Sequence, residues 1–109
     1  MSNWPIFFRD VLKVGNPESN VGICTLWTEQ HMIYHGLNED SYAVIGNMYY
    51  PDGINYIIRN VYANPNIRYI ILCGQDISSA GEVFIKFMNN GTDENYVIKG
   101  TDFAIEKEI

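Results

Sequence analysis

Short hydrophobic runs alternate with segments of helical periodicity along most of this 109-residue chain. The longest unbroken apolar run, 69–73, lies within the stretch 67–76 and is followed at once by Gly74, Gln75 and Asp76. Such a run is typical of a strand that is buried on both faces. We therefore predict that segment 69–73 is a central strand of a parallel sheet.

Three further segments, 20–26, 42–45 and 96–98, are predicted to be strands because they are rich in β-branched or aromatic residues and are bounded by turn-forming residues. Helices are predicted between them. The first, 29–35, begins after Thr28 as a cap and ends at Gly36, and the second, 54–62, has an apolar stripe. The third begins at Ser78 or Ser79 and ends at 90–91.

This alternation of strands and helices predicts right-handed crossovers and one Rossmann-like α/β domain over residues 1–109. We expect three layers, with a small, mostly parallel sheet of about four strands flanked by helices. Residues 1–19 form an N-terminal arm, which is either a short strand pair or irregular. The acidic tail, 102–109, is a candidate for a short last helix.

Charge and composition exclude several classes of partner. The chain has 13 acidic and 7 basic residues, a net charge of −6, and its basic residues are scattered, so we expect no nucleic-acid binding. No apolar run approaches the roughly 18 residues of a membrane helix, and no signal-peptide pattern is seen, so we expect a cytoplasmic protein without membrane contact. Cys24 and Cys73 lie in apolar runs and are predicted to be buried, reduced thiols.

The loops after the predicted strands are the first place to look for a site, because ligands of open α/β sheets bind beyond the carboxyl ends of the strands. No dinucleotide-binding or P-loop glycine pattern is present. Aromatic rings in these loops offer faces for a flat heterocycle, and Asp76 with Asn47 can pair with an amidine-like edge such as that of a pterin. The candidate ligand-binding residues are Trp27, Thr28, Gly46, Asn47, Tyr49, Gly74, Gln75, Asp76, Ser79 and Glu82.

Several of these residues also have a purely structural interpretation. Asp76 either binds a ligand or accepts hydrogen bonds from the amides that follow it, and helix capping accounts for Ser79. His31 and His35 share one helical face, but no third metal ligand is fixed nearby, so a solvent-facing pair is favoured over a metal site. No catalytic constellation is predicted.

Five motifs of the chain, taken in order, resemble the A subunit of tetrahydromethanopterin S-methyltransferase. They are 4–5, 14–19, 21–26, 63–69 and 72–74. Segments 46–49 and 53–60 are similar to the pterin-binding domain that accompanies archaeal-type thymidylate synthases. The similarity extends from Trp4 almost to the C-terminus and includes 89–91 and 103–105.

The resemblance implies a Rossmann-like domain of one-carbon metabolism that binds a reduced pterin, either tetrahydrofolate or tetrahydromethanopterin. Its implied partners are a thymidylate synthase or further copies of the chain. The methyltransferase A subunit carries a corrinoid through a histidine in the loop after the Cys-Gly strand, but the corresponding loop here, 75–82, has no histidine, so we expect no corrinoid. Two alternatives remain: an interaction module that keeps the fold without a ligand, or a methyl-transfer subunit that uses Asp76 or Glu82.

Overall fold

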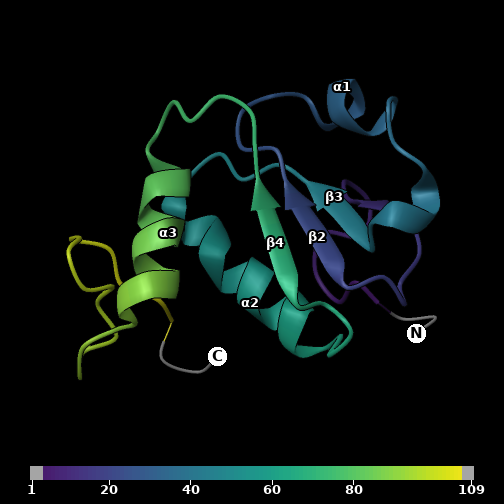
Figure 1. The fold of residues 1–109 in the computed structure, drawn as a ribbon. Coiled ribbons are helices and arrows are strands. Elements are labelled where there is room, and N and C mark those ends of the chain that lie inside the picture. Colours follow the sequence, from purple (N-terminus) through teal and green to yellow (C-terminus); the bar gives the residue numbers. More distant parts are fainter. Residues whose placement is uncertain (1–3, 107–109) are drawn as a thin grey trace.

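The computed structural model of the protein describes residues 4–106, which form a small mixed α/β fold (Figure 1). Its elements are, in chain order, β1 (Lys13–Val14), β2 (Val21–Cys24), α1 (Gln30–Tyr34), the 3₁₀ turn η1 (Glu39–Ser41), β3 (Val44–Gly46), the 3₁₀ turn η2 (Pro51–Gly53), α2 (Ile54–Tyr62), β4 (Tyr69–Leu72) and α3 (Ala80–Asn90). The helix predicted over 54–62 is confirmed, and the strands predicted around 20–26 and 42–45 are present in shorter form.

The four strands form one sheet in the order β1–β3–β2–β4. β2 is parallel to both β3 and β4, whereas β1 is antiparallel to β3. Gly22 of β2 pairs with Val44 on one side and with Ile70 on the other, so β2 is a strand with neighbours on both sides. A four-stranded, mostly parallel sheet is therefore confirmed.

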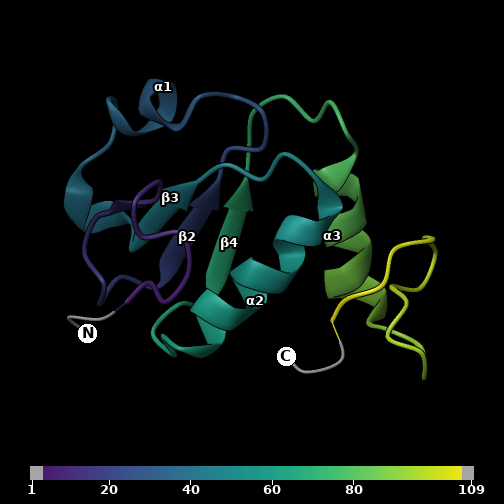
Figure 2. The same ribbon diagram turned by 180° about the vertical axis from the view of Figure 1, so that it is seen from behind.

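The prediction that segment 69–73 is a central strand is wrong, because β4 is an edge strand. Ile70 and Leu72 pack against the core, while Tyr69 and Ile71 on the opposite face are 62% and 49% exposed. An apolar run alone does not distinguish a buried strand from an edge strand with one exposed apolar face. Helix α2 lies against one face of the sheet (Figure 2), and the predicted three-layer arrangement is not confirmed.

Segment 96–98 does not add a strand to the sheet, contrary to our prediction. Tyr96 has a left-handed backbone (φ 65°), and the Asp93 carboxylate accepts hydrogen bonds from the amides of Asn95 and Val97 at 2.8 and 3.0 Å. Such local side-chain bonds close a turn and compete with strand formation. Ile98 is 1% exposed and packs into the core instead, so the fourth strand of the sheet is β1, which the arm supplies.

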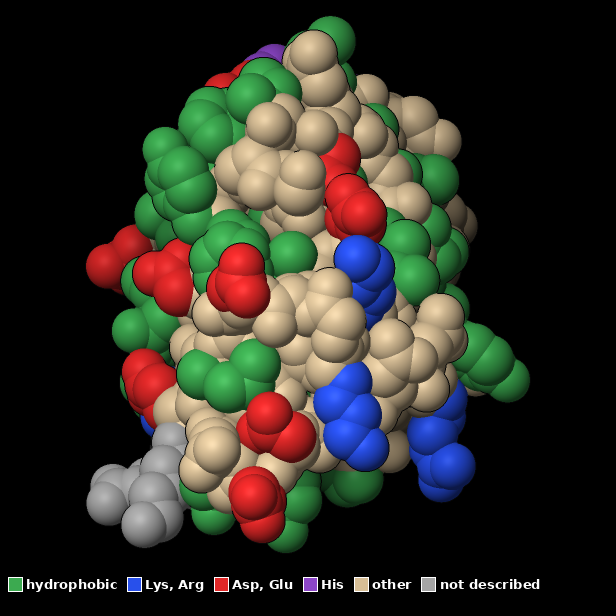
Figure 3. All heavy atoms as spheres, turned by 90° about the vertical axis from the view of Figure 1, so that its left-hand side faces the viewer, with side chains coloured by type: hydrophobic (Ala, Val, Ile, Leu, Met, Phe, Trp, Pro, Cys, Tyr) green, Lys and Arg blue, Asp and Glu red, His purple; other side chains and the backbone are tan. Residues whose placement is uncertain are grey.

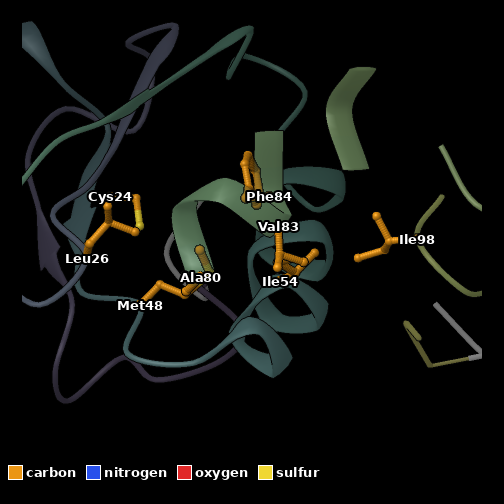
Figure 4. Close-up of a cluster of buried hydrophobic side chains, with 8 residues drawn as sticks. All are labelled: Cys24, Leu26, Met48, Ile54, Ala80, Val83, Phe84 and Ile98. Carbon is orange, nitrogen blue, oxygen red and sulfur yellow. The ribbon is translucent and has the colours of Figure 1, made fainter. Parts of the chain in front are cut away.

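The main hydrophobic core lies between the sheet, α2 and α3. Its buried members, drawn in Figure 4, are Cys24, Leu26, Met48, Ile54, Ala80, Val83, Phe84 and Ile98. The apolar stripe predicted on α2 thus faces the core, through Ile54 and the partly buried Ile57 and Ile58. Burial raises the pKa of the Cys24 thiol to about 11, so this thiol stays protonated, as expected of a core cysteine.

The arm is irregular over residues 4–12 and is held by one asparagine of α2. The Asn60 Oδ1 accepts hydrogen bonds from the amides of Ile6 and Phe7 at 2.9 and 3.0 Å, and its Nδ2 donates to the Phe7 carbonyl at 3.1 Å. The Trp4 indole N–H donates to the Asn60 carbonyl at 2.7 Å. At the other end of the chain residues 102–106 form no helix, and 107–109 lie outside the described residues.

Two expectations about surfaces can be compared with residues 4–106. In this part of the chain no helix has the length and apolar character needed to cross a bilayer. No group of three or more His, Cys, Asp or Glu side chains in the same range is placed to hold a metal ion. His31 and His35 are both exposed, with ring centroids 6.0 Å apart, as predicted for a solvent-facing pair.

Candidate functional site

The loops that follow β2, β3 and β4 meet at one edge of the sheet and are joined by hydrogen bonds. The Asn47 Nδ2, after β3, donates to the carbonyl oxygens of Leu26 and Thr28, after β2, at 2.9 and 2.6 Å. The Gln75 amide, after β4, donates to the Thr28 Oγ1 at 2.9 Å. The structure therefore brings together the strand-end residues that the sequence singled out, and it uses their polar atoms to do so.

Trp27 supports two tyrosines of the neighbouring loop. Its indole N–H donates to the Tyr49 carbonyl at 2.8 Å, and its ring meets the rings of Tyr49 and Tyr50 edge-on, with centroids 5.1 and 5.6 Å apart. Its backbone amide donates to the Gln75 carbonyl at 3.0 Å. Trp27 thus couples the β4 loop to the tyrosines.

Two predicted helix caps are wrong. Thr28 does not cap α1, because its Oγ1 accepts from the Gln75 amide, and no side-chain cap is seen at Glu29, the residue before α1. Ser79 lies before α3 in a left-handed conformation (φ 64°) and makes no capping bond. The α3 helix is capped by Asp76 instead.

Both carboxylate oxygens of Asp76 accept hydrogen bonds from the first turn of α3. Oδ1 accepts from the Gly81 amide and Oδ2 from the Glu82 amide, each at 3.1 Å. A carboxylate in this position satisfies amides that have no partner within the helix. The Glu82 side chain is exposed and lies 3.6 Å from the Lys86 Nζ, so neither acid of this loop is a free ligand group.

We expect Asp76→Ala to lower the free energy of unfolding by about 1–2 kcal/mol, because two helix amides lose their acceptor. Urea unfolding followed by circular dichroism measures this loss. Asp102→Ala, which replaces an exposed carboxylate outside the helices, is the matched control and should cost under about 0.5 kcal/mol. Equal losses in both variants would mean that the capping role is wrong.

A wide cleft opens between the strand ends, the arm and the start of α2. Its volume is about 570 Å³. We call it the arm cleft, and define it by its lining residues: Phe8, Val11, Leu12, Glu29, Gln30, Asn47, Met48, Tyr49, Tyr50, Asp52, Gly53 and Tyr56. Of the candidate residues predicted from the sequence, it contains Asn47 and Tyr49.

Gly46 and Gly74 have steric roles next to these loops. A Cβ at Gly46 would lie 2.2 Å from the Leu12 Cδ2, so the glycine lets the arm lie close against β3. Gly46 also lines a cavity of about 110 Å³ between the sheet and α2. Gly74 has a φ of 88° and closes the turn after β4.

The lining of the arm cleft is aromatic and acidic. Among the described residues that line it, the charged side chains are Glu29 and Asp52, and no lysine or arginine is present. The Gln30 Nε2 donates to the Val11 carbonyl at 2.6 Å and ties the arm to α1, whereas the Gln30 Oε1 is buried with no hydrogen-bond partner. The cleft therefore offers oxygen acceptors and ring faces, which suits a ligand with several N–H donors.

Sequence reasoning missed most residues of this cleft. Glu29, Gln30, Asp52 and Tyr56 carry no local signal that distinguishes them from other helical surface residues. Phe8 of the arm, with its ring centroid 4.7 Å from that of Tyr56, is placed by contacts with residues almost fifty positions away. The one signal in the sequence was the run of aromatic residues in the arm.

The residues of the loop 75–82 do not fit a corrinoid held through a histidine. This loop contains no histidine, and its acids are engaged with α3. The two histidines of the chain, His31 and His35, lie on and just after α1, which follows β2 rather than β4. The loop after β4 therefore supplies no axial ligand for a corrinoid cobalt.

Comparison with known proteins places the chain in a family. The family model for the A subunit of tetrahydromethanopterin S-methyltransferase matches residues 1–106. The chain belongs to this family. The resemblance seen in the sequence motifs is thereby confirmed for the methyltransferase A subunit, whereas the comparison gives no support to the link with a thymidylate synthase.

Several members of the family resemble the chain along nearly its whole length. The tetrahydromethanopterin S-methyltransferase A subunit of Methanocaldococcus jannaschii is 36% identical over 109 residues, and that of Methanopyrus kandleri is 36% identical over 107 residues. One of the numbered A subunits of Methanobrevibacter ruminantium, number 2, is 35% identical over 116 residues. Each match covers 94% of this chain but only 42%, 43% and 53% of the respective relative, so the chain spans about half the length of the relatives it matches.

Proposed function

We propose that this chain is a small, non-catalytic domain of one-carbon metabolism that binds a reduced pterin in the arm cleft. The observation that carries the proposal is the lining of the cleft, in which two carboxylates lie among the rings of Phe8, Tyr49, Tyr50 and Tyr56. The 2-aminopyrimidinone edge of a pterin presents two adjacent N–H donors, which one carboxylate can accept together. Aromatic faces suit the flat part of such a ring.

The family gives this proposal independent support. The relatives are named as the A subunit of a tetrahydromethanopterin S-methyltransferase, so we propose a role in methyl transfer beside other subunits. Tetrahydrofolate carries the same pyrimidinone edge and is the second candidate ligand. A thymidylate synthase as partner rests on the similarity of segments 46–49 and 53–60 alone.

Within the cleft we assign the pyrimidinone edge to Asp52 or Glu29 rather than to Asp76 and Asn47. Asp52 lies in η2 at the start of α2, and both it and Glu29 are exposed, so their oxygens are accessible. The oxygens of Asp76 already accept from α3, and the amide nitrogen of Asn47 already donates to two carbonyls. Tyr49 and Tyr50, which Trp27 supports, supply the ring faces.

Isothermal titration calorimetry of the purified chain with tetrahydromethanopterin and tetrahydrofolate tests the proposal. We expect saturable binding that the double variant Glu29→Gln, Asp52→Asn weakens by about tenfold or more, because a charged acceptor becomes neutral. Glu94→Gln, an exposed acid outside the cleft, is the control and should bind like the parent. Trp27 fluorescence should change on binding, and Trp27→Phe should remove that signal while calorimetry still detects the ligand.

Two results would contradict the proposal. The first is no binding of either pterin at millimolar concentration by both methods. The second is binding that the double variant leaves unchanged, which would put the ligand elsewhere on the chain. A methyl-transfer role without pterin contact would then be the better interpretation of the family relationship.

A further inference from the structure

The outer edge of β4 has backbone groups with no partner. The Cys73 amide donates to the Cys24 carbonyl at 2.9 Å, which directs the odd-numbered peptide groups of this strand towards β2. Because these groups alternate along a strand, those of Ile70 and Leu72 point away from β2. Within residues 4–106 neither outward-facing group takes part in a hydrogen bond on that side.

The sequence of β4 contains nothing that blocks pairing at this edge. From 69 to 73 there is no charged residue and no proline. Natural edge strands are usually protected by charged side chains, proline, a bulge or very short length. The opposite edge, β1, is protected in this way, because it is two residues long and contains Lys13. The edge of β4 therefore has the properties of a strand that receives a partner.

Helix α3 provides an apolar wall next to this edge. A groove of about 390 Å³ runs between the end of β4 and α3, with Leu72, Cys73 and Ile85 among its lining residues. Ile85 is 51% exposed, and Met88, one turn further along the same side of α3, is 63% exposed. Figure 3 views the molecule from the side on which α3 lies, and hydrophobic side chains are visible there between charged ones. We call this hollow the edge groove.

We propose that the edge groove binds one extended segment of a partner polypeptide as an added β-strand. Its backbone pairs with the outward peptide groups of Ile70 and Leu72, and every second side chain packs on Ile85. The inference is independent of pterin binding, since the arm cleft and the edge groove have no lining residue in common.

The surroundings of the groove determine what kind of segment fits. Figures 1 and 2 both place α3 beyond the edge of β4, so the sheet of a second folded copy cannot reach this edge, whereas a single extended strand can. The charged side chains at the groove are already engaged, because Glu82 lies 3.6 Å from Lys86 and Asp76 caps α3. A charge on the bound strand would face Ile85 without a counter-ion, so the side chains that face α3 are uncharged and apolar.

Peptides selected on the purified chain test this inference. The probe is a fluorescently labelled, capped octapeptide obtained from a displayed random library, and fluorescence anisotropy measures its affinity. We expect alternating apolar residues in the selected sequences. N-methylation of the peptide backbone at every second residue should weaken binding by about tenfold or more, whereas methylation at the intervening residues should have little effect, because only alternate amides face β4.

Matched protein variants locate the binding site. Ile85→Lys should weaken binding of the selected peptide by about tenfold or more, because it places a charge in the apolar wall. Met32→Lys makes the same change at an exposed position of α1, 68% accessible and outside the edge groove, and should leave binding unchanged. The inference is overturned by a selection that yields no binding peptide, by methylation effects without a period of two, or by a peptide that binds Ile85→Lys like the parent.

Discussion

Gly74→Ala should destabilise the protein more than any other exposed-site substitution in the strand-end loops. The glycine has a φ of 88°, and an added Cβ would lie 2.3 Å from the Thr25 carbonyl oxygen and 2.7 Å from the Thr28 Oγ1. Left-handed strain costs about 1–2 kcal/mol, and the clash with a backbone atom adds to it, so we expect a total loss of about 3–4 kcal/mol. Thermal unfolding followed by circular dichroism should show a midpoint lowered by roughly 12–20 °C.

The matched control for this substitution is Gly91→Ala. Gly91 also has a positive φ, 69°, but no atom lies within 4 Å of the position of its added Cβ. It should therefore show the strain alone, about 1 kcal/mol. If the two variants lost the same stability, the close packing of the β4 turn against Thr25 and Thr28 would not be what Gly74 is needed for.

The same contacts link Gly74 to the candidate site. A turn that moved away from Thr25 would carry the Gln75 amide away from the Thr28 Oγ1, and this hydrogen bond joins two of the three strand-end loops. Thr28 is in turn held by Asn47, whose loop continues into the tyrosines of the arm cleft. Local geometry after β4 thus affects a cleft that β4 does not line.

The elements that could be predicted are those whose sequence pattern determines both their type and their partner face. The stripe of isoleucines in α2 has one apolar face, and the only way to bury it is against a sheet, so residues 54–62 are helical as predicted. The strand-end network is equally predictable in outline, because parallel strands necessarily end at the same edge. Trp27, Thr28, Asn47 and Gln75 meet for this reason.

The elements that could not be predicted depend on long-range contacts. β1 is only two residues long, and its pairing with β3 depends on where the arm runs. The position of β4 at the edge depends on segment 96–98 turning back at Asp93 rather than joining the sheet. The arm cleft was missed for the same reason, since its acids and rings come from the arm, α1 and α2, and are brought together only by the fold.

Asn60→Ala should both destabilise the fold and release the arm. The substitution removes three hydrogen bonds between the Asn60 side chain and the backbone of Ile6 and Phe7, and it leaves those partly buried groups unsatisfied. At about 1 kcal/mol for each bond we expect a loss of about 3 kcal/mol in urea unfolding. Asn66→Ala is the control, because its side chain is exposed and makes one long contact of 3.5 Å with the Pro17 carbonyl, so it should cost under about 0.5 kcal/mol. Because Phe8, Val11 and Leu12 line the arm cleft, Asn60→Ala should also weaken pterin binding at temperatures where the variant is still folded. A variant that loses stability but binds the pterin like the parent would show that the arm is not part of the binding site.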